Sequence, residues 1–168
     1  YKDLGEQLAV FFKGLYSQSL LDLAALRAKI GDIDDHYQAF VAANKMGKCP
    51  FCGIGDIKGE HHSKREAYDH FLPKGTYPFN SVNFRNLAPM CHECNSSYKL
   101  QKDPVRHIDP LHNAKTATRR KAFYSYAAAA PGISIDVALT TTDLANISQA
   151  DITLTITSPG RAEEVESW

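Results

Sequence analysis

Two short stretches, CPFC at residues 49–52 and CHEC at residues 91–94, decide how the middle of this chain folds. Each is a C-x₂-C pair, and 38 residues separate the two pairs. A C-x₂-C turn directs two sulfurs at one metal ion, so two such pairs are typical of a tetrahedral structural zinc site. We therefore expect a closed zinc site that holds a loop-rich segment together, with two disulfide bonds as the alternative. All four cysteines of the chain belong to these pairs: Cys49, Cys52, Cys91 and Cys94.

The composition is that of an ordinary soluble protein that can bury one real core. Of its 168 residues, 43% are hydrophobic and 23% are charged, and no apolar run approaches the ~20 residues that span a membrane. No signal peptide is visible and no cysteine is left for scattered disulfides, so we expect a reducing, cytoplasmic compartment and no membrane contact. The chain begins at Tyr1 and a helical pattern stops abruptly at Trp168, so we expect the natural protein to continue further.

The formal net charge of zero hides a basic middle. Residues 45–130 carry 14 Lys and Arg against seven Asp and Glu, whereas the two ends together carry five against 12. A basic surface beside a metal site is the electrostatic pattern of a protein that binds a polyanion such as DNA. For the run Arg119-Arg120-Lys121 taken alone, a solvated helix face is the alternative.

The two flanks of the central segment have different patterns. Residues 1–44 are rich in helix formers at helical spacing, with Gly31 suited to end one helix and Asp32 suited to cap the next. In the C-terminal region, residues 104–168, alternating apolar residues predict a small hairpin between two helical stretches. The elements expected there are a helix over 113–127, paired strands at 133–139 and 152–156, and a helix from 158 onward.

The central region, residues 45–103, predicts the order strand, loop, strand, cysteine pair and helix. We expect the first strand near 65–72, the second through 82–87, and a short helix over 95–102 that the following Asp-Pro stops. The fold class is therefore α+β, with N-terminal helices, a zinc-braced central unit, and a C-terminal region with a helix and a small hairpin.

The sequence from residue 68 to residue 99 resembles the HNH endonuclease family. The resemblance rests on YDHFLPK at 68–74, on NLAPMCHECN at 86–95, and on Lys99. It covers residues 49–103, about a third of the chain, and leaves both flanks outside. It implies the ββα-metal (His-Me finger) fold, which two C-x₂-C pairs often brace with zinc, and a nuclease activity.

The resemblance also implies a role for each matching residue. His70 corresponds to the general base and Asp69 to the carboxylate that binds the catalytic metal. Asn86 corresponds to the residue that braces the loop and helps to orient the base. Asn95 takes the last position of the motif, where it stands in place of a histidine as a metal ligand. Oxygen ligands from Asp69 and Asn95 suit Mg²⁺ or Mn²⁺.

Elementary chemistry agrees with these roles and adds a geometric condition. A histidine can take a proton from water near neutral pH, and a divalent cation can stabilise the phosphoryl oxygens and the leaving group. Because neighbouring strand residues point to opposite faces, Asp69 and His70 require a bend at the strand end, close to Pro73. Taken singly, each of these polar residues has a plain alternative as a strand end, a turn residue or a helix cap.

Several basic side chains are predicted to contact nucleic acid, with a solvated side chain as the alternative for each: Lys74, Lys99, Arg85, His61 and His62. The leading hypothesis is a DNA endonuclease that leaves 5′-phosphate and 3′-hydroxyl ends. A zinc-ribbon module that binds nucleic acid or protein without catalysis is one alternative, and an RNase on the same scaffold is another. The flanks are available to dock a regulatory protein or a second copy in a homodimer. In bacteria such cassettes often belong to restriction, phage-defence or mobile-element proteins.

Overall fold

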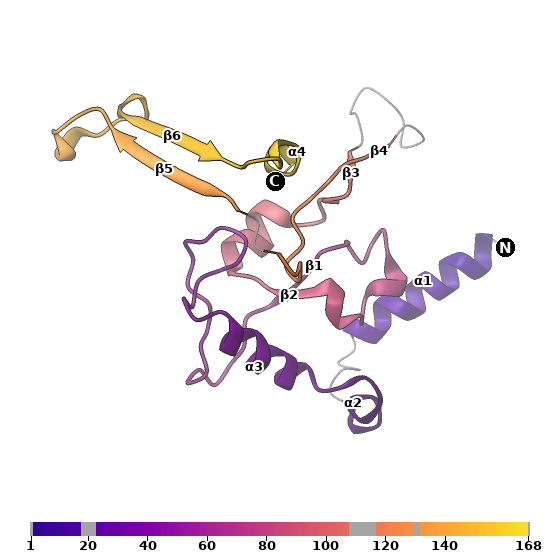
Figure 1. Ribbon diagram of the computed structural model, residues 1–168. Coiled ribbons are helices and arrows are strands. Elements are labelled where there is room, and N and C mark those ends of the chain that lie inside the picture. Colours follow the sequence, from indigo (N-terminus) through magenta and orange to yellow (C-terminus); the bar gives the residue numbers. More distant parts are fainter. Residues whose placement is uncertain (1, 18–22, 108–116, 130–131, 168) are drawn as a thin grey trace.

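The computed structural model describes residues 2–17, 23–107, 117–129 and 132–167, and its architecture is α+β (Figure 1). Helices at the N-terminus lead into a small central unit, and three separate two-stranded sheets occur among the described residues. None of the described helices is long and apolar enough to cross a membrane. The predicted fold class is confirmed at this level: N-terminal helices, small hairpins and a cluster of four cysteines.

The N-terminal region forms its helices where the sequence predicts them. Gly31 follows the second helix with a φ of 94°, a conformation that glycine adopts without strain. Asp32 caps the third helix, because its carboxylate accepts a hydrogen bond from the Asp34 N–H at 2.9 Å. Residues 18–22 of the expected helical stretch lie outside the described residues. The three helices are α1 (Lys2–Ser17), α2 (Ala24–Ile30) and α3 (Ile33–Ala43).

The central sheet is made of two very short antiparallel strands, β1 (Tyr68–His70) and β2 (Leu87–Pro89). Their register places Asp69 opposite Ala88 and His70 opposite Leu87. All six strand residues are buried. Both strands are shorter than predicted, but their order and the position of the Asp-His pair are as expected.

The segment before β2 corrects the prediction of a strand through residues 82–87. Phe84–Asn86 form a 3₁₀ helix instead. The cause is local, since the Asn83 side chain accepts a hydrogen bond from the Arg85 N–H at 3.0 Å and so favours a turn over an extended chain. After β2, the predicted helix is a single π-helical segment, Cys94–Lys99, that ends at Leu100 with a φ of 48°.

The hydrophobic core lies where α3 packs against the central unit. Ile33 and Tyr37 of α3 are each 2% exposed, and they belong to one buried cluster with Leu87 and the buried cysteines. The Tyr37 hydroxyl donates to the Lys58 carbonyl at 2.8 Å and accepts from the Glu66 N–H at 3.2 Å. These contacts attach α3 to the loop that leads into β1, so α3 supports the strand that carries the Asp-His pair.

The helix predicted over residues 113–127 is wrong for the part that the structure describes. Residues 113–116 lie outside it, and residues 117–127 contain the strand β4 (Thr118–Arg119) followed by chain without regular structure. The hydroxyls of Tyr124 and Tyr126 both donate to carbonyls of the central unit. Residues two apart share one side of an extended chain but not of a helix, so these two contacts favour the extended form.

The C-terminal hairpin agrees with its prediction. Strands β5 (Ser134–Leu139) and β6 (Ile152–Thr157) pair over all six residues and project away from the central unit (Figure 1). A short helix, α4 (Ala162–Ser167), follows as expected. A third ribbon pairs β3 (Arg106–His107) with β4.

Candidate functional site

The four cysteines come together in one cluster, as the spacing predicts. Their sulfur atoms all lie within 4.8 Å of one another, and none of the four is in a disulfide bond. Three of them are buried and Cys52 is exposed. Four convergent thiols at this separation suggest a structural Zn²⁺ site without an open coordination position.

The loops around the cluster prepare its sulfurs for a cation. The Gly55 N–H donates to Cys52 Sγ at 3.4 Å, and the Cys91 N–H donates to Cys49 Sγ at 3.5 Å. Burial raises the pKa of the Cys52 thiol, but the N–H groups of Gly55 and Ile54 outweigh it and lower the pKa to about 7. A Cβ on Gly55 would lie 3.0 Å from Cys91 Sγ, so a larger residue there would push against the cysteine cluster. The donor set and its surroundings therefore fit zinc.

A second group of predicted residues lines one cavity of about 240 Å³ beside β1. Asp69, His70 and Asn95 all contribute to its wall. The strand β1 ends at His70 and the chain bends at Phe71 and Leu72. This bend comes directly after the pair, because Asp69 and His70 both keep the β1 register, and both residues nevertheless border the same cavity.

His70 is held in one orientation and one tautomer. Its Nε2 lies 3.0 Å from the Ser81 carbonyl oxygen. A carbonyl accepts only, so Nε2 carries the proton and Nδ1 keeps its lone pair in the neutral ring. Burial lowers the pKa of His70 to about 4, so the ring is neutral at physiological pH.

Asn86 ties together the loop that surrounds His70. Its side-chain oxygen accepts from the Leu72 N–H at 2.8 Å, and its amide donates to the carbonyls of Leu72 and Asn80 at 3.0 and 3.2 Å. The Asn80 carbonyl directly precedes Ser81, whose own carbonyl holds His70. Asn86 therefore braces the loop on which the orientation of His70 depends.

Among the described residues, one carboxylate oxygen of Asp69 finds no hydrogen-bond partner. Its Oδ2 atom is buried, and the Lys99 ammonium lies 3.6 Å away, beyond hydrogen-bonding distance. Lys99 donates instead to the His70 carbonyl at 3.1 Å. Burial raises the pKa of Asp69 and lowers the pKa of Lys99. A buried carboxylate oxygen without a hydrogen bond, at a cavity that Asn95 also lines, is a donor set that fits a hard divalent cation.

The side chains predicted to contact nucleic acid separate into two groups. Lys74 lines the cavity of Asp69, and Lys99 reaches its carboxylate. Arg85 is exposed outside the lining of that cavity, and His61 and His62 are exposed on a loop that lines other hollows. The structure therefore brings only the two lysines to the Asp-His pair.

Tyr16 of α1 is a neighbour of the site that sequence reasoning missed. Its ring meets the His70 ring edge-on, with centroids 4.4 Å apart, and Lys74 lies over its other side, 4.7 Å from the centroid. The same helix contacts the central unit through Phe12, whose ring lies 4.9 Å from that of Phe79. No sequence signal could have found Tyr16, because one tyrosine on a helix has no motif.

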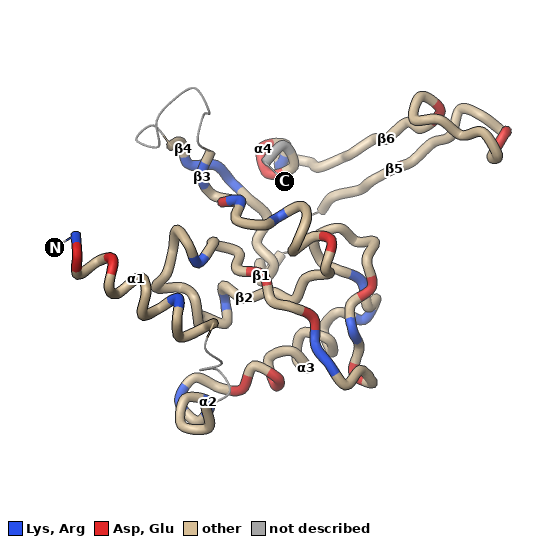
Figure 2. Tube along the Cα trace, turned by 180° about the vertical axis from the view of Figure 1, so that it is seen from behind, with Lys and Arg blue, Asp and Glu red and all other residues tan. Residues whose placement is uncertain are grey.

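The basic run at residues 119–121 does not lie on a helix. Arg106 of β3 stands opposite Arg119 of β4, and Arg120 follows directly. Lys and Arg accordingly gather along this ribbon (Figure 2). The alternative of a solvated helix face is therefore wrong in its secondary structure.

Comparison with known proteins finds distant homologues. The chain is 31% identical to the Septu protein PtuB of Bacillus thuringiensis over 107 residues, which are 62% of this chain and 38% of PtuB. It is 44% identical to protein ea31 of Escherichia phage lambda over 68 residues, which are 40% of this chain and 19% of ea31. The matched part thus spans well under half the length of either relative. No family model matches the chain, and no solved structure matches it.

Proposed function

We propose that this chain is a metal-dependent HNH endonuclease that hydrolyses phosphodiester bonds of DNA on a zinc-braced ββα-metal unit. One observation carries the proposal: Asp69, His70 and Asn95 line a single cavity. The resemblance to the HNH family selects four residues: Asp69, His70, Asn86 and Asn95. Three of them, Asp69, His70 and Asn95, border one cavity although they are up to 26 positions apart in the chain. The names of PtuB and ea31 state no reaction, so the proposal rests on the cavity.

In this mechanism His70 is the general base. Its Nε2–H is engaged with the Ser81 carbonyl, so Nδ1 is the atom that takes a proton from the attacking water. The ring is neutral before the reaction because burial lowers its pKa. Asn86 keeps the loop of Ser81 in place while the ring accepts the proton.

Asp69 and Asn95 would hold Mg²⁺ or Mn²⁺ through their side-chain oxygens. The bound cation supplies charge stabilisation to the phosphoryl oxygens and to the leaving O3′, which gives 5′-phosphate and 3′-hydroxyl products. Lys99 stands next to Asp69 and adds positive charge for a phosphate group. Lys74, at the cavity edge, is a second candidate for a phosphate contact.

The first test is cleavage of supercoiled plasmid by the purified zinc-loaded chain with Mg²⁺, with Mn²⁺ and without either. We expect metal-dependent nicking that His70→Ala abolishes. His107→Ala, an exposed histidine on β3, is the matched control and should cut like the wild type. Zinc content and circular dichroism would show that each variant is folded.

The outcomes separate the candidate functions. A folded, zinc-loaded chain that binds DNA but cuts neither DNA nor RNA with either metal would refute the nuclease and leave a zinc-ribbon binding module. The Asp69–Lys99 contact is the observation that favours this second candidate, since it partly compensates the carboxylate without a metal. Labelled RNA of the same sequence would reveal an RNase.

A further inference from the structure

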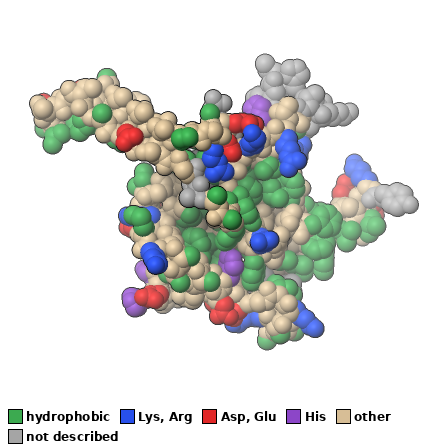
Figure 3. All heavy atoms as spheres, viewed as in Figure 1, with side chains coloured by type: hydrophobic (Ala, Val, Ile, Leu, Met, Phe, Trp, Pro, Cys, Tyr) green, Lys and Arg blue, Asp and Glu red, His purple; other side chains and the backbone are tan. Residues whose placement is uncertain are grey.

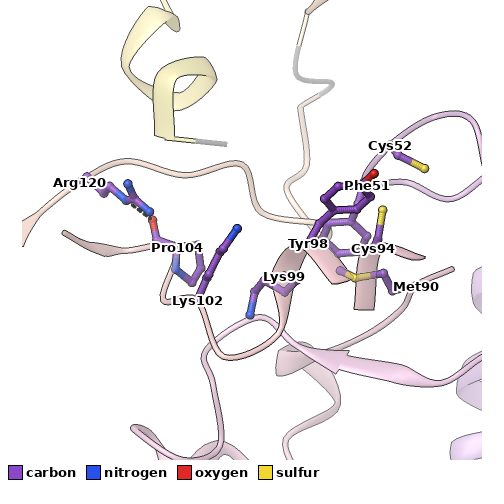
Figure 4. A pocket seen from close by; sticks show the side chains of 9 residues that line it. All are labelled: Phe51, Cys52, Met90, Cys94, Tyr98, Lys99, Lys102, Pro104 and Arg120. Carbon is purple, nitrogen blue, oxygen red and sulfur yellow. Dashed lines mark hydrogen bonds between the residues drawn. The ribbon is translucent and has the colours of Figure 1, made fainter. Parts of the chain in front are cut away.

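A second cavity of about 320 Å³ lies between the first cysteine loop and the end of the π-helix (Figure 4). Its apolar part includes Met90, which is 1% exposed, and the rings of Phe51 and Tyr98. Tyr98 is 68% exposed although it lines a hollow. A flat aromatic ring that remains open to solvent inside a cavity is a surface on which a nucleobase stacks.

Three basic side chains line this cavity: Lys99, Lys102 and Arg120. No described Asp or Glu lines it, and its thiol groups are those of Cys52 and Cys94 of the cysteine cluster, whose sulfurs would bind the zinc. Arg120 is fixed by two hydrogen bonds from its guanidinium, to the Pro104 carbonyl at 3.3 Å and to the Asp103 carbonyl at 3.4 Å. A cavity with an aromatic wall and three basic side chains matches a ligand that is flat at one end and anionic at the other.

Two acidic side chains are close to these cations: Asp69, whose carboxylate lies 3.6 Å from the Lys99 ammonium, and Asp103, which directly follows Lys102 in the chain. The Asp103 carboxylate accepts from the Tyr77 hydroxyl at 2.8 Å and from the Val105 N–H at 3.1 Å, and it does not line the cavity. Lys102 is exposed, and its side chain makes no hydrogen bond or ion pair with another described residue; its backbone N–H donates to the Lys99 carbonyl at 2.9 Å. Its ammonium is therefore available to an anion.

Lys99 connects this cavity with the Asp-His pair. It lines the cavity, and its ammonium also lies 3.6 Å from Asp69 and 3.1 Å from the His70 carbonyl oxygen. A ligand in the cavity would therefore sit next to the candidate scissile position. The volume, near the lower end of the range for small-molecule sites, suits a single nucleotide and excludes a base pair.

We propose that this cavity binds one unstacked nucleotide, with its base against Tyr98 and its phosphate against Lys102 and Arg120. In the endonuclease proposed above, the nucleotide belongs to the substrate strand beside the scissile phosphate, so this part of the inference rests on the proposed function. A base must leave the duplex to enter, so the chain favours single-stranded or locally opened DNA over intact duplex.

The test is binding, measured by fluorescence anisotropy with a labelled 12-nucleotide strand, zinc-loaded protein and no added Mg²⁺ or Mn²⁺. Loss of stacking on one base corresponds to a loss of about fivefold or more in affinity. We expect this loss in Tyr98→Ala, while Tyr98→Phe keeps wild-type affinity. Ser97→Ala, the exposed neighbour that does not line the cavity, is the matched control and should bind like the wild type.

Two further arms identify the ligand. In the first, the same sequence as a duplex should bind more weakly than the single strand, and Tyr98→Ala should erase the difference. In the second, free deoxynucleoside monophosphates at millimolar concentration compete with the strand only if the cavity accepts an isolated nucleotide. Lys102→Ala should weaken binding and reduce its salt dependence, because one phosphate contact is removed.

The result that overturns the inference is a folded, zinc-loaded Tyr98→Ala that binds single strand and duplex like the wild type. Failure of the nuclease looks different. If the wild type cuts no nucleic acid but prefers single strands, and Tyr98→Ala abolishes this preference, the nucleotide site is supported and the nuclease activity is refuted.

Discussion

The central sheet and the C-terminal hairpin are both two-stranded antiparallel ladders, yet they relate to solvent in opposite ways. β1 and β2 pair over three residues and are entirely buried, whereas β5 and β6 pair over six residues and are entirely exposed. The longer ladder pairs more residues, but all of its residues remain exposed to solvent. The comparison teaches that burial and cross-linking, rather than ladder length, make a rigid platform for a site.

The register shows what the hairpin leaves uncovered. Directly opposed residues of an antiparallel pair share a face, so six large apolar side chains lie on one side of the hairpin. They are between 44% and 62% exposed, and Figure 3 shows hydrophobic atoms at the surface of the hairpin. In the central unit the equivalent apolar residue, Leu87, is completely buried. The six are Ile135, Val137, Leu139, Ile152, Leu154 and Ile156.

Loss of zinc should have the largest effect, because it should unfold the buried central unit and leave no rigid platform to compare with the hairpin. Structural zinc contributes about 10–16 kcal/mol in zinc-finger peptides, and three of the four cysteines here belong to the core cluster. We expect Cys94→Ser to release the metal, unfold the central unit and abolish nicking. Metal content and near-ultraviolet circular dichroism measure this, with Ser97→Ala as the control that keeps its zinc. A Cys94→Ser protein with native spectra would contradict a structural role.

Truncation of Leu87 should have the next largest effect. The residue is fully buried between β1 and α3, so Leu87→Ala loses apolar burial and leaves a cavity. We expect a decrease of about 2–5 kcal/mol in the free energy of unfolding, measured by urea denaturation of the zinc-loaded chain. A decrease below about 1 kcal/mol would contradict the tight packing of Leu87 in the central unit.

Asn86→Ala should loosen the loop around His70. It removes the side chain that makes three hydrogen bonds, so the part-buried N–H and carbonyl of Leu72 lose this partner, while the Asn80 carbonyl keeps only its bond from the Asn83 N–H at 3.2 Å. We expect about 1–3 kcal/mol lower stability, together with slower nicking at saturating DNA. Asn83→Ala, which loses two exposed hydrogen bonds, from the Arg85 N–H and to the Asn80 side chain, is the control and should retain the nicking rate. Equal nicking rates in Asn86→Ala and Asn83→Ala would contradict the bracing role of Asn86.

Tyr126→Phe tests the attachment of the C-terminal region to the central unit. The Tyr126 hydroxyl donates to the Leu87 carbonyl at 2.5 Å. The hydroxyl also lies 3.3 Å from His36 Nε2. Its removal should lower the free energy of unfolding by about 1–2 kcal/mol, because the ring stays and only these hydroxyl contacts are lost. The melting temperature of the zinc-loaded chain measures the change. No shift would indicate that water replaces the hydroxyl at no cost.

The smallest effect is expected on the hairpin. Leu154→Ala removes a side chain that is already 58% exposed, so little burial is lost in the monomer. We expect a change of about 0.5 kcal/mol or less, measured as for Leu87→Ala. A loss as large as that of Leu87 would show that the apolar face of the hairpin is covered in solution.

Prediction from sequence succeeded where the signal was local. Gly31 and Asp32 were recognised from helix-end chemistry, and the hairpin from strict alternation of apolar residues. The motif selected Asp69, His70 and Asn95 before any geometry was known, and all three line one cavity. Their chemical roles stay predictions until cleavage is measured.

Prediction failed where distant contacts decide the structure. The stretch before Tyr124 has residues compatible with a helix, but the hydroxyls of Tyr124 and Tyr126 bind carbonyls of the central unit 39 residues earlier in the chain. Tertiary contacts of this kind override weak helix propensity. Tyr16 escaped notice for the same reason, because its contact with His70 joins residues that the sequence does not relate.

The sequence by itself determined the cysteine cluster and the α+β class, because cysteine spacing and apolar period act over a few residues, and its resemblance to the HNH family selected the candidate catalytic residues. Only the tertiary structure decided which nitrogen of His70 is free, that Lys99 stands between Asp69 and a second cavity, and that α1 covers His70 with Tyr16. These features depend on packing between segments far apart in the chain, and packing is not encoded in any local pattern.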